Sequence, residues 1–73
     1  MIATLIAKTL VRADHVRSFH IRPVPGLGWE AAEREDQRVV QQRCYTDWHR
    51  VEQTLARFTR EIADLREQGW RDA

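Results

Sequence analysis

Residues 47–70, DWHRVEQTLARFTREIADLREQGW, decide the fold because their apolar side chains recur every three or four positions. That spacing places the apolar residues on one face of a helix and excludes a strand. Polar and charged residues fill most of the other positions, so we predict an amphipathic helix at about 47–68 that buries one face. The predicted core residues on this helix are Trp48, Val51, Leu55, Phe58, Ile62 and Leu65.

Both ends of the predicted helix carry recognisable signals. Thr46 or Asp47 can accept hydrogen bonds from the free amides of the first turn. Gly69 suits the left-handed position that follows a helix, and Trp70 would then pack back on Leu65. We therefore add Trp70 to the predicted core, where it closes the far end of the helix.

Length and composition limit the class of protein. Seventy-three residues allow one small domain, residues 1–73, which is marginally stable on its own. The single cysteine, Cys44, excludes an internal disulfide and fits a reducing cytoplasm. No apolar run approaches the roughly 18 residues of a membrane span. The apolar start of the chain lacks the basic region and the cleavage site of a signal peptide.

Two strands are predicted ahead of the first clear break in the chain. Residues 2–12 and 15–22 are rich in β-branched side chains, which favour strands. The apolar residues of the first segment also fit a helical spacing, so a helix there stays open. The break is PVPGLG at residues 23–28, where two prolines and two glycines make a loop.

The first two strands are predicted to form a hairpin. Asp14 is a common turn former, and a two-residue turn at Asp14 and His15 would set Leu10 opposite Phe19. An aliphatic side chain opposite an aromatic one is a favourable cross-strand pair. Phe19 therefore joins the predicted core.

Residues 29–46, WEAAEREDQRVVQQRCYT, allow two interpretations, of which we favour a second hairpin. Its strands would lie at about 28–35 and 38–46, with the turn near Asp36 and Gln37. No Asn-Gly or Asp-Gly pair marks this turn, which weakens the interpretation. The register would place Glu35 opposite Arg38 and Glu30 opposite Arg43, and would gather Trp29, Ala31, Val40 and Cys44 on one face.

In the second interpretation this segment continues the C-terminal helix. Its glutamate, alanine, arginine and glutamine residues are good helix formers. The cap-like pair Thr46 and Asp47 would then lie in mid-helix, and the helix would reach an unusual length of about 40 residues. Such a chain would be a short N-terminal hairpin with a long helix, pairing as a coiled-coil-like dimer.

The favoured architecture is an α+β fold in which a four-stranded antiparallel meander is followed by one long amphipathic helix. One helix covers only one face of such a sheet, so the other face is solvated or docked. A chain this short also gains stability from association. We therefore expect a homo-oligomer, namely a homodimer, or a module bound to a protein partner, with Trp29 as a candidate interface residue.

The alternative function is nucleic-acid binding through the open face of the sheet. In the predicted registers this face carries Arg43 and Tyr45 from one hairpin, and His20 and Arg22 from the other. Arginine beside an aromatic residue on a sheet can contact phosphates and stack on bases. The formal net charge of +1 is low for such a role.

The outer face of the predicted helix is a further candidate surface. Arg50, Arg57 and Arg60 precede the acidic residues of this face, which opposes the preference of the helix dipole for acids first. The ordinary interpretation is a solvated surface. The functional interpretation is that these arginines meet an acidic partner or the acidic segment 30–36 of a second subunit.

We expect no enzyme, no metal and no cofactor, and we expect no small-molecule substrate. Cys44, Asp47 and His49 are possible zinc ligands, but their spacing matches no structural zinc pattern. The ordinary interpretation of these residues is a buried free thiol, a helix cap and an exposed histidine. A sheet of four short strands under one helix also has little room for a substrate cleft.

At YTDWHRVEQTLARF, with GWEAAERED before it and LREQGW after it, the chain resembles small bacterial proteins of uncharacterised function. That resemblance covers nearly the whole chain and implies no activity. The outline of strands followed by a helix ending in Gly-aromatic is also similar to the WGR domain of some DNA-associated enzymes. The Trp-Gly-Arg signature is absent, Gly28-Trp29-Glu30 being the nearest match, so no residue is transferred from that family.

Overall fold

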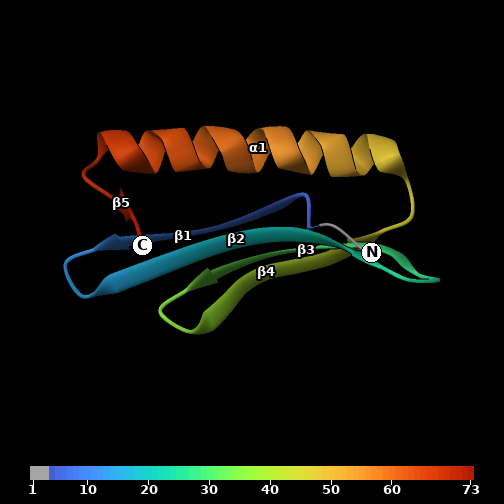
Figure 1. Ribbon diagram of the computed structural model, residues 1–73, viewed down its shortest axis with the longest axis horizontal. Coiled ribbons are helices and arrows are strands. Elements are labelled where there is room, and N and C mark those ends of the chain that lie inside the picture. Colours follow the sequence, from blue (N-terminus) through green and yellow to red (C-terminus); the bar gives the residue numbers. More distant parts are fainter. Residues whose placement is uncertain (1–3) are drawn as a thin grey trace.

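The computed structural model describes residues 4–73 and shows a five-stranded antiparallel sheet with one helix across one face (Figure 1). The predicted α+β architecture, an antiparallel meander followed by a C-terminal helix, is confirmed. The alternative of a hairpin with a continuous long helix is wrong, because residues 29–46 form two strands. In sheet order the strands are β4 (Arg38–Tyr45), β3 (Gly28–Glu35), β2 (His15–Val24), β1 (Ile6–Arg12) and β5 (Arg71–Asp72), and the helix is α1 (Trp48–Glu67).

The first two strands differ from their predicted bounds. β1 begins at Ile6 rather than at residue 2, and residues 1–3 lie outside the described part of the chain. β2 continues through Pro23, which was predicted to end it. The described pairs between β1 and β2 stop at Ile21, so Pro23 is paired only with β3. A proline is tolerated there because this part of β2 behaves as an edge.

The first hairpin turns one residue earlier than predicted. Ala13 and Asp14 form the turn, with a positive φ of 53° at Ala13. Leu10 consequently pairs with Arg17, and Phe19 pairs with Lys8, so the predicted pairing of Leu10 with Phe19 is wrong. Moving a turn by one residue shifts the register by two, which keeps every side chain on its face. Leu10 and Phe19 therefore both lie in the core.

The second hairpin follows the predicted register only near its turn. Asp36 and Gln37 have φ values of 52° and 71°, the two positive values of a type I′ turn, and Glu35 pairs with Arg38. A bulge opposite Glu33 and Arg34 then adds one residue to β4, since Val40 has no partner in the register. Beyond the bulge, the predicted pairing and shared face are wrong: Glu30 pairs with Cys44, Ala31 with Arg43, and Trp29 with Tyr45.

The helix ends in the predicted Schellman motif. Gly69 has a φ of 97°, and its N–H donates to the Arg66 carbonyl at 3.2 Å. The Trp70 N–H donates to the Leu65 carbonyl at 3.0 Å. These two bonds are the defining pair of the motif, and they turn the chain back toward the sheet.

The reversed chain forms β5, a strand that the sequence pattern did not predict. Its two residues pair with Leu10 and Val11 of β1. The carboxylate of Asp72 anchors it, because Lys8 Nζ lies 2.9 Å away and the Arg66 guanidinium donates to both oxygens at 2.9 to 3.1 Å. β5 therefore covers part of the β1 edge of the sheet.

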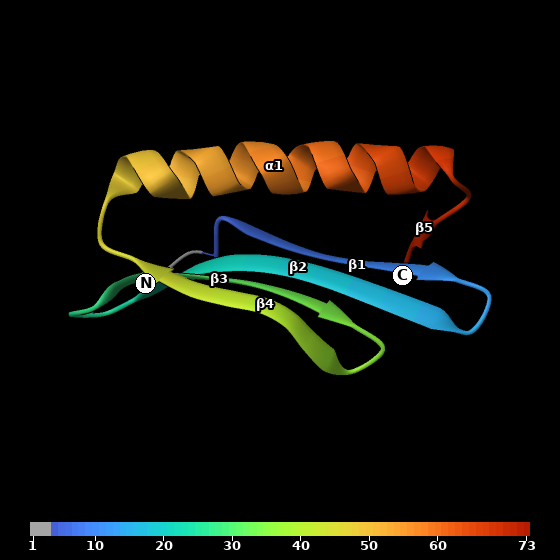
Figure 2. The ribbon, with the colours of Figure 1, turned by 180° about the vertical axis from the view of Figure 1, so that it is seen from behind.

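The core lies between α1 and the sheet face toward it (Figure 2). Phe58 on α1 packs edge-on against Phe19 on β2, with ring centroids 5.2 Å apart. Leu55 and Trp70 are partly buried and pack against this core. No helix within residues 4–73 is long and apolar enough to cross a membrane. The buried apolar residues of the cluster are Leu10, Phe19, Ile21, Ala31, Val51, Phe58, Ile62 and Leu65.

Two tryptophans have exchanged their predicted places. Trp48, predicted in the core, is 47% exposed at the start of α1. Trp29, predicted as an interface residue, is partly buried and packs against the core. Their rings lie 5.2 Å apart, so Trp48 partly covers Trp29 instead of entering the core itself. Trp48 is the first residue of α1, and the buried residues of the helix begin one turn later, at Val51.

Candidate interaction surface

β4 is an edge strand at one end of the described sheet. It pairs with β3 on one side, and no strand within residues 4–73 pairs with it on the other (Figure 1). Its eight residues thus present a row of backbone donors and acceptors to solvent. The opposite edge differs, because β5 lies along β1 at Leu10 and Val11.

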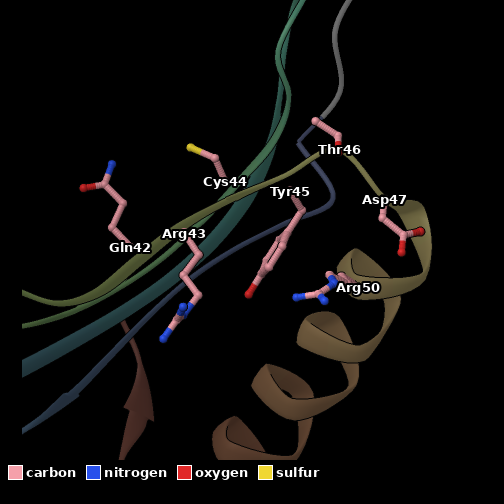
Figure 3. A pocket seen from close by; sticks show the side chains of 7 residues that line it. All are labelled: Gln42, Arg43, Cys44, Tyr45, Thr46, Asp47 and Arg50. Carbon is pink, nitrogen blue, oxygen red and sulfur yellow. The ribbon is translucent and has the colours of Figure 1, made fainter.

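A shallow groove runs between the end of β4 and the first turns of α1. Seven residues line it, and Figure 3 shows all of them. The side chains of Arg43 and Tyr45 point toward the α1 side, where Arg50 lies. Gln42 and Cys44 point the opposite way, as the alternation of a strand requires. The groove therefore brings together three of the predicted interaction residues.

The bulge in β4 places Arg43 and Tyr45 here. In the unbulged register both would lie on the open face, as predicted from the sequence. One inserted residue moves every later side chain of β4 to the other face. The predicted surface of Arg43 and Tyr45 beside His20 and Arg22 is therefore wrong, because only the latter two lie on the open face.

Arg57 extends the positive charge along the flank of α1. Its Nη2 donates to Gln41 Oε1 of β4 at 3.5 Å, so it faces the strand rather than the outer side of the helix. Asp47 is the acid among the lining residues, and its Oδ1 already accepts the His49 N–H at 2.9 Å. We call Gln41, Arg43, Tyr45, Arg50 and Arg57 the basic groove.

Three predicted interaction residues lie elsewhere. Arg22 is on the open face, where its Nε donates to Glu30 Oε1 at 3.0 Å. Trp29 packs against the core. Arg60 is exposed on α1, and its side chain makes no hydrogen bond or ion pair within residues 4–73. The basic groove and the open face are therefore separate surfaces.

The open face carries an ion-pair cluster around Glu30. Its carboxylate accepts hydrogen bonds from Arg22 at 3.0 Å and Gln42 at 3.1 Å, and lies 3.1 Å from His20 Nε2. Hydrogen bonding to His20, then to Arg22 and Gln42, lowers the pKa of Glu30 to about 2. The carboxylate is thus ionised at neutral pH and neutralises the basic side chains around it.

A second acidic cluster lies under the helix, and sequence reasoning missed it. Glu33 is 6% exposed and forms an ion pair with Arg17. Glu61 of α1 faces the same place, and its Oε2 is buried without a hydrogen-bond partner in residues 4–73. Burial, and then the charge of Glu33, raise the pKa of Glu61. The alternation of Trp29, Ala31 and Glu33 along β3 was the available signal, since it places Glu33 on the buried face.

The tips of the two hairpins are clamped by Asp36. Its Oδ1 accepts the Val16 N–H at 2.8 Å, and its Oδ2 lies 2.9 Å from His15 Nδ1. The hydrogen bond to Asp36 raises the pKa of His15, and the same bond lowers the pKa of Asp36. This clamp fixes the β3–β4 hairpin against β2 at the end away from the groove.

No group of three or more candidate metal ligands gathers within residues 4–73. Cys44 is exposed, so its interpretation as a buried thiol is wrong. Its side chain points away from Tyr45, on the open-face side of β4. The exposed position follows from the same bulge that carried Tyr45 toward the helix.

Comparison with known proteins does not indicate a function for this chain. The resemblances to small bacterial proteins and to the WGR domain stay predictions. No protein-family model matches the chain, and no curated protein or solved structure matches it significantly.

Proposed function

We propose that this protein is a small non-catalytic interaction module that binds an extended polypeptide segment along β4. The observation that carries the proposal is the eight-residue edge of β4, which has no partner strand within residues 4–73 and adjoins the basic groove. Strand addition would satisfy the outward backbone groups of β4, and the groove would distinguish among side chains. The exposed thiol of Cys44 suits a reducing cytoplasm.

Charge on β4 favours a different polypeptide over a second copy of this chain. The strand holds Arg38 and Arg43 and no acidic residue. Pairing β4 with itself would bring four arginines together without a compensating carboxylate, and like charges across strands are destabilising. Arginines on an edge strand are also a common protection against self-pairing. The homo-oligomer therefore becomes the less favoured form of the module.

Nucleic-acid binding through the open face is less well supported. The basic residues expected there, His20 and Arg22, lie against the Glu30 carboxylate. The arginine and tyrosine that were to accompany them lie in the basic groove instead. A groove with one aromatic side chain offers little stacking surface for successive bases.

Strand addition is tested with capped peptides of about nine residues, roughly the length of β4. One peptide alternates threonine and glutamate, and another alternates threonine and glutamine. Each peptide is also made in two N-methylated forms. In one form the odd-numbered residues are methylated and in the other the even-numbered residues, so each form blocks the N–H groups on one edge of the extended peptide. We expect a binding peptide to slow hydrogen exchange of β4 amides, and one of the two methylation patterns to abolish this protection.

The contrary results are equally clear. Binding that survives both methylation patterns would exclude backbone pairing. Protection confined to β1, or an absence of protection with every peptide, would exclude β4 as the binding edge. Sedimentation of the free protein as a dimer, with β4 amides already protected, would favour self-association.

A further inference from the structure

We infer that the segment bound at β4 is acidic, with carboxylates at alternate positions on the side that faces α1. This inference rests on the proposed function and names the chemistry of its partner. Three arginines, Arg43, Arg50 and Arg57, lie along the helix side of the β4 edge. An added strand would place every second side chain beside them.

The two sides of an added strand would meet different surroundings. On the α1 side, β4 presents Arg43 and Tyr45, and the helix adds Arg50. On the open-face side, β4 presents the uncharged Gln42 and Cys44. Carboxylates on the first side would meet guanidinium groups, which bind them with two parallel hydrogen bonds. On the second side, the neighbouring side chains of β4 itself carry no charge, and Arg22 already pairs with Glu30.

Acids of this chain leave the groove positive. Asp47 uses an oxygen on the backbone of α1, so it caps the helix rather than pairing with Arg43 or Arg50. Glu33 is held by Arg17 beneath the helix. Within residues 4–73, no ion pair involves Arg43, Arg50 or Arg57. Arg43 and Arg50 are therefore available to carboxylates of another chain, whereas Arg57 also lies near Glu61, where its charge partly offsets the raised pKa of that carboxyl.

The affinity of the peptide should depend on where its carboxylates lie and not only on how many it has. The test compares the Thr/Glu alternating peptide with a peptide of the same composition whose glutamates form one block. A Thr/Lys alternating peptide reverses the sign. We expect the alternating acidic peptide to bind about tenfold more tightly than the block peptide, and the lysine peptide not to bind, by calorimetry at about 0.15 M salt.

Two variants with the same change of charge test whether the acidic peptide binds at the basic groove. Arg43→Glu reverses a charge in the basic groove, and Arg60→Glu reverses one on exposed helix surface. We expect Arg43→Glu to weaken the alternating acidic peptide about tenfold or more, and Arg60→Glu to weaken it less than about twofold. An amide spectrum of each variant confirms that it is folded, and Arg43→Gln repeats the test with a smaller perturbation.

Each contrary outcome has a distinct meaning. Equal binding of the alternating and block peptides, or equal losses in Arg43→Glu and Arg60→Glu, would reduce the effect to general electrostatics and overturn the inference. A Thr/Gln peptide that binds as tightly as the Thr/Glu peptide, and remains sensitive to N-methylation, would overturn the inference while leaving strand addition intact. Tighter binding of a thymidine oligonucleotide to the same arginines would overturn it in favour of single-stranded nucleic acid.

Discussion

At the scale of single residues, Glu61 carries a charge that its surroundings disfavour. Burial raises its pKa, and the neighbouring Glu33 adds to the effect. The folded state therefore binds a proton more readily than the unfolded chain, whose carboxyl titrates near 4.5. The free energy of unfolding contributed by this group is consequently largest below that value and falls as pH rises through the raised pKa.

Glu61→Gln should therefore stabilise the protein at pH 7. An amide removes the buried charge and can donate to the Glu33 carboxylate, so we expect a gain of about 1 kcal/mol in urea unfolding. At pH 4, which lies below the pKa of this carboxyl in both the folded and the unfolded chain, the gain should shrink. Glu67→Gln is the matched control, because Glu67 is exposed on the same helix. A gain that is equal at both pH values would exclude titration of Glu61 as its cause.

Glu30 titrates in the opposite sense. Its pKa falls from 4.5 to about 2 in the folded state, because hydrogen bonds from His20, Arg22 and Gln42 favour the carboxylate. Its contribution to stability is present above about 4.5 and is lost as pH falls toward 2. We expect Glu30→Gln to flatten this part of the acid unfolding curve, followed by urea midpoints from pH 6 to pH 2. A variant as acid-sensitive as the parent would show that other carboxylates dominate.

Gly28 is needed for space as well as for its backbone angle. Its φ is 112°, and a Cβ there would overlap the carbonyl oxygen of Tyr45. We expect Gly28→Ala to cost at least about 2 kcal/mol, because strain and overlap add. Gly26→Ala is the control: Gly26 also has a positive φ, 77°, but a Cβ there meets nothing within 4 Å. It should cost only about 1 kcal/mol in the same thermal or urea measurement.

At the scale of elements, α1 holds the molecule together through its central turns. Phe58 is 1% exposed and packs on Phe19, whereas Leu55 is only partly buried. We expect Phe58→Ala to cost about 3–5 kcal/mol and Leu55→Ala about 2 kcal/mol, measured by urea unfolding. Equal losses at both positions would indicate that the helix sits rotated about its axis relative to the described structure.

The same helix was the most predictable element, and the β3–β4 hairpin the least. The helical period, the Asp47 cap and Gly69 are local signals, and local signals survive in a single sequence. The hairpin turn uses Asp36 and Gln37, which adopt positive φ without the usual glycine. No residue type marks the bulge at Val40, so the face taken by Arg43 and Tyr45 could not be read from alternation.

At the scale of the whole molecule, every residue of the basic groove except Gln41 could be predicted from the sequence, but their common location could not. The sequence predicted two separate surfaces: the open face of the sheet, with Arg43 and Tyr45, and the outer face of the helix, with Arg50 and Arg57. The bulge in β4 and the short connection to α1 merge them into one. β5 was equally hidden, because two residues carry no pattern, and its place depends on where the helix ends.

That short strand has a consequence for assembly. A fibre grows by strand pairing only if every unit offers two open sides, one to receive and one to extend. In this fold, a strand approaching β1 meets Ala73, whose N–H already donates to the Thr9 carbonyl at 2.9 Å. In β1, only Ile6, Ala7, Lys8 and Arg12 have no backbone partner in residues 71–73. A copy of this protein joined to the end of a growing sheet would therefore act as a terminator, halting growth after a single step.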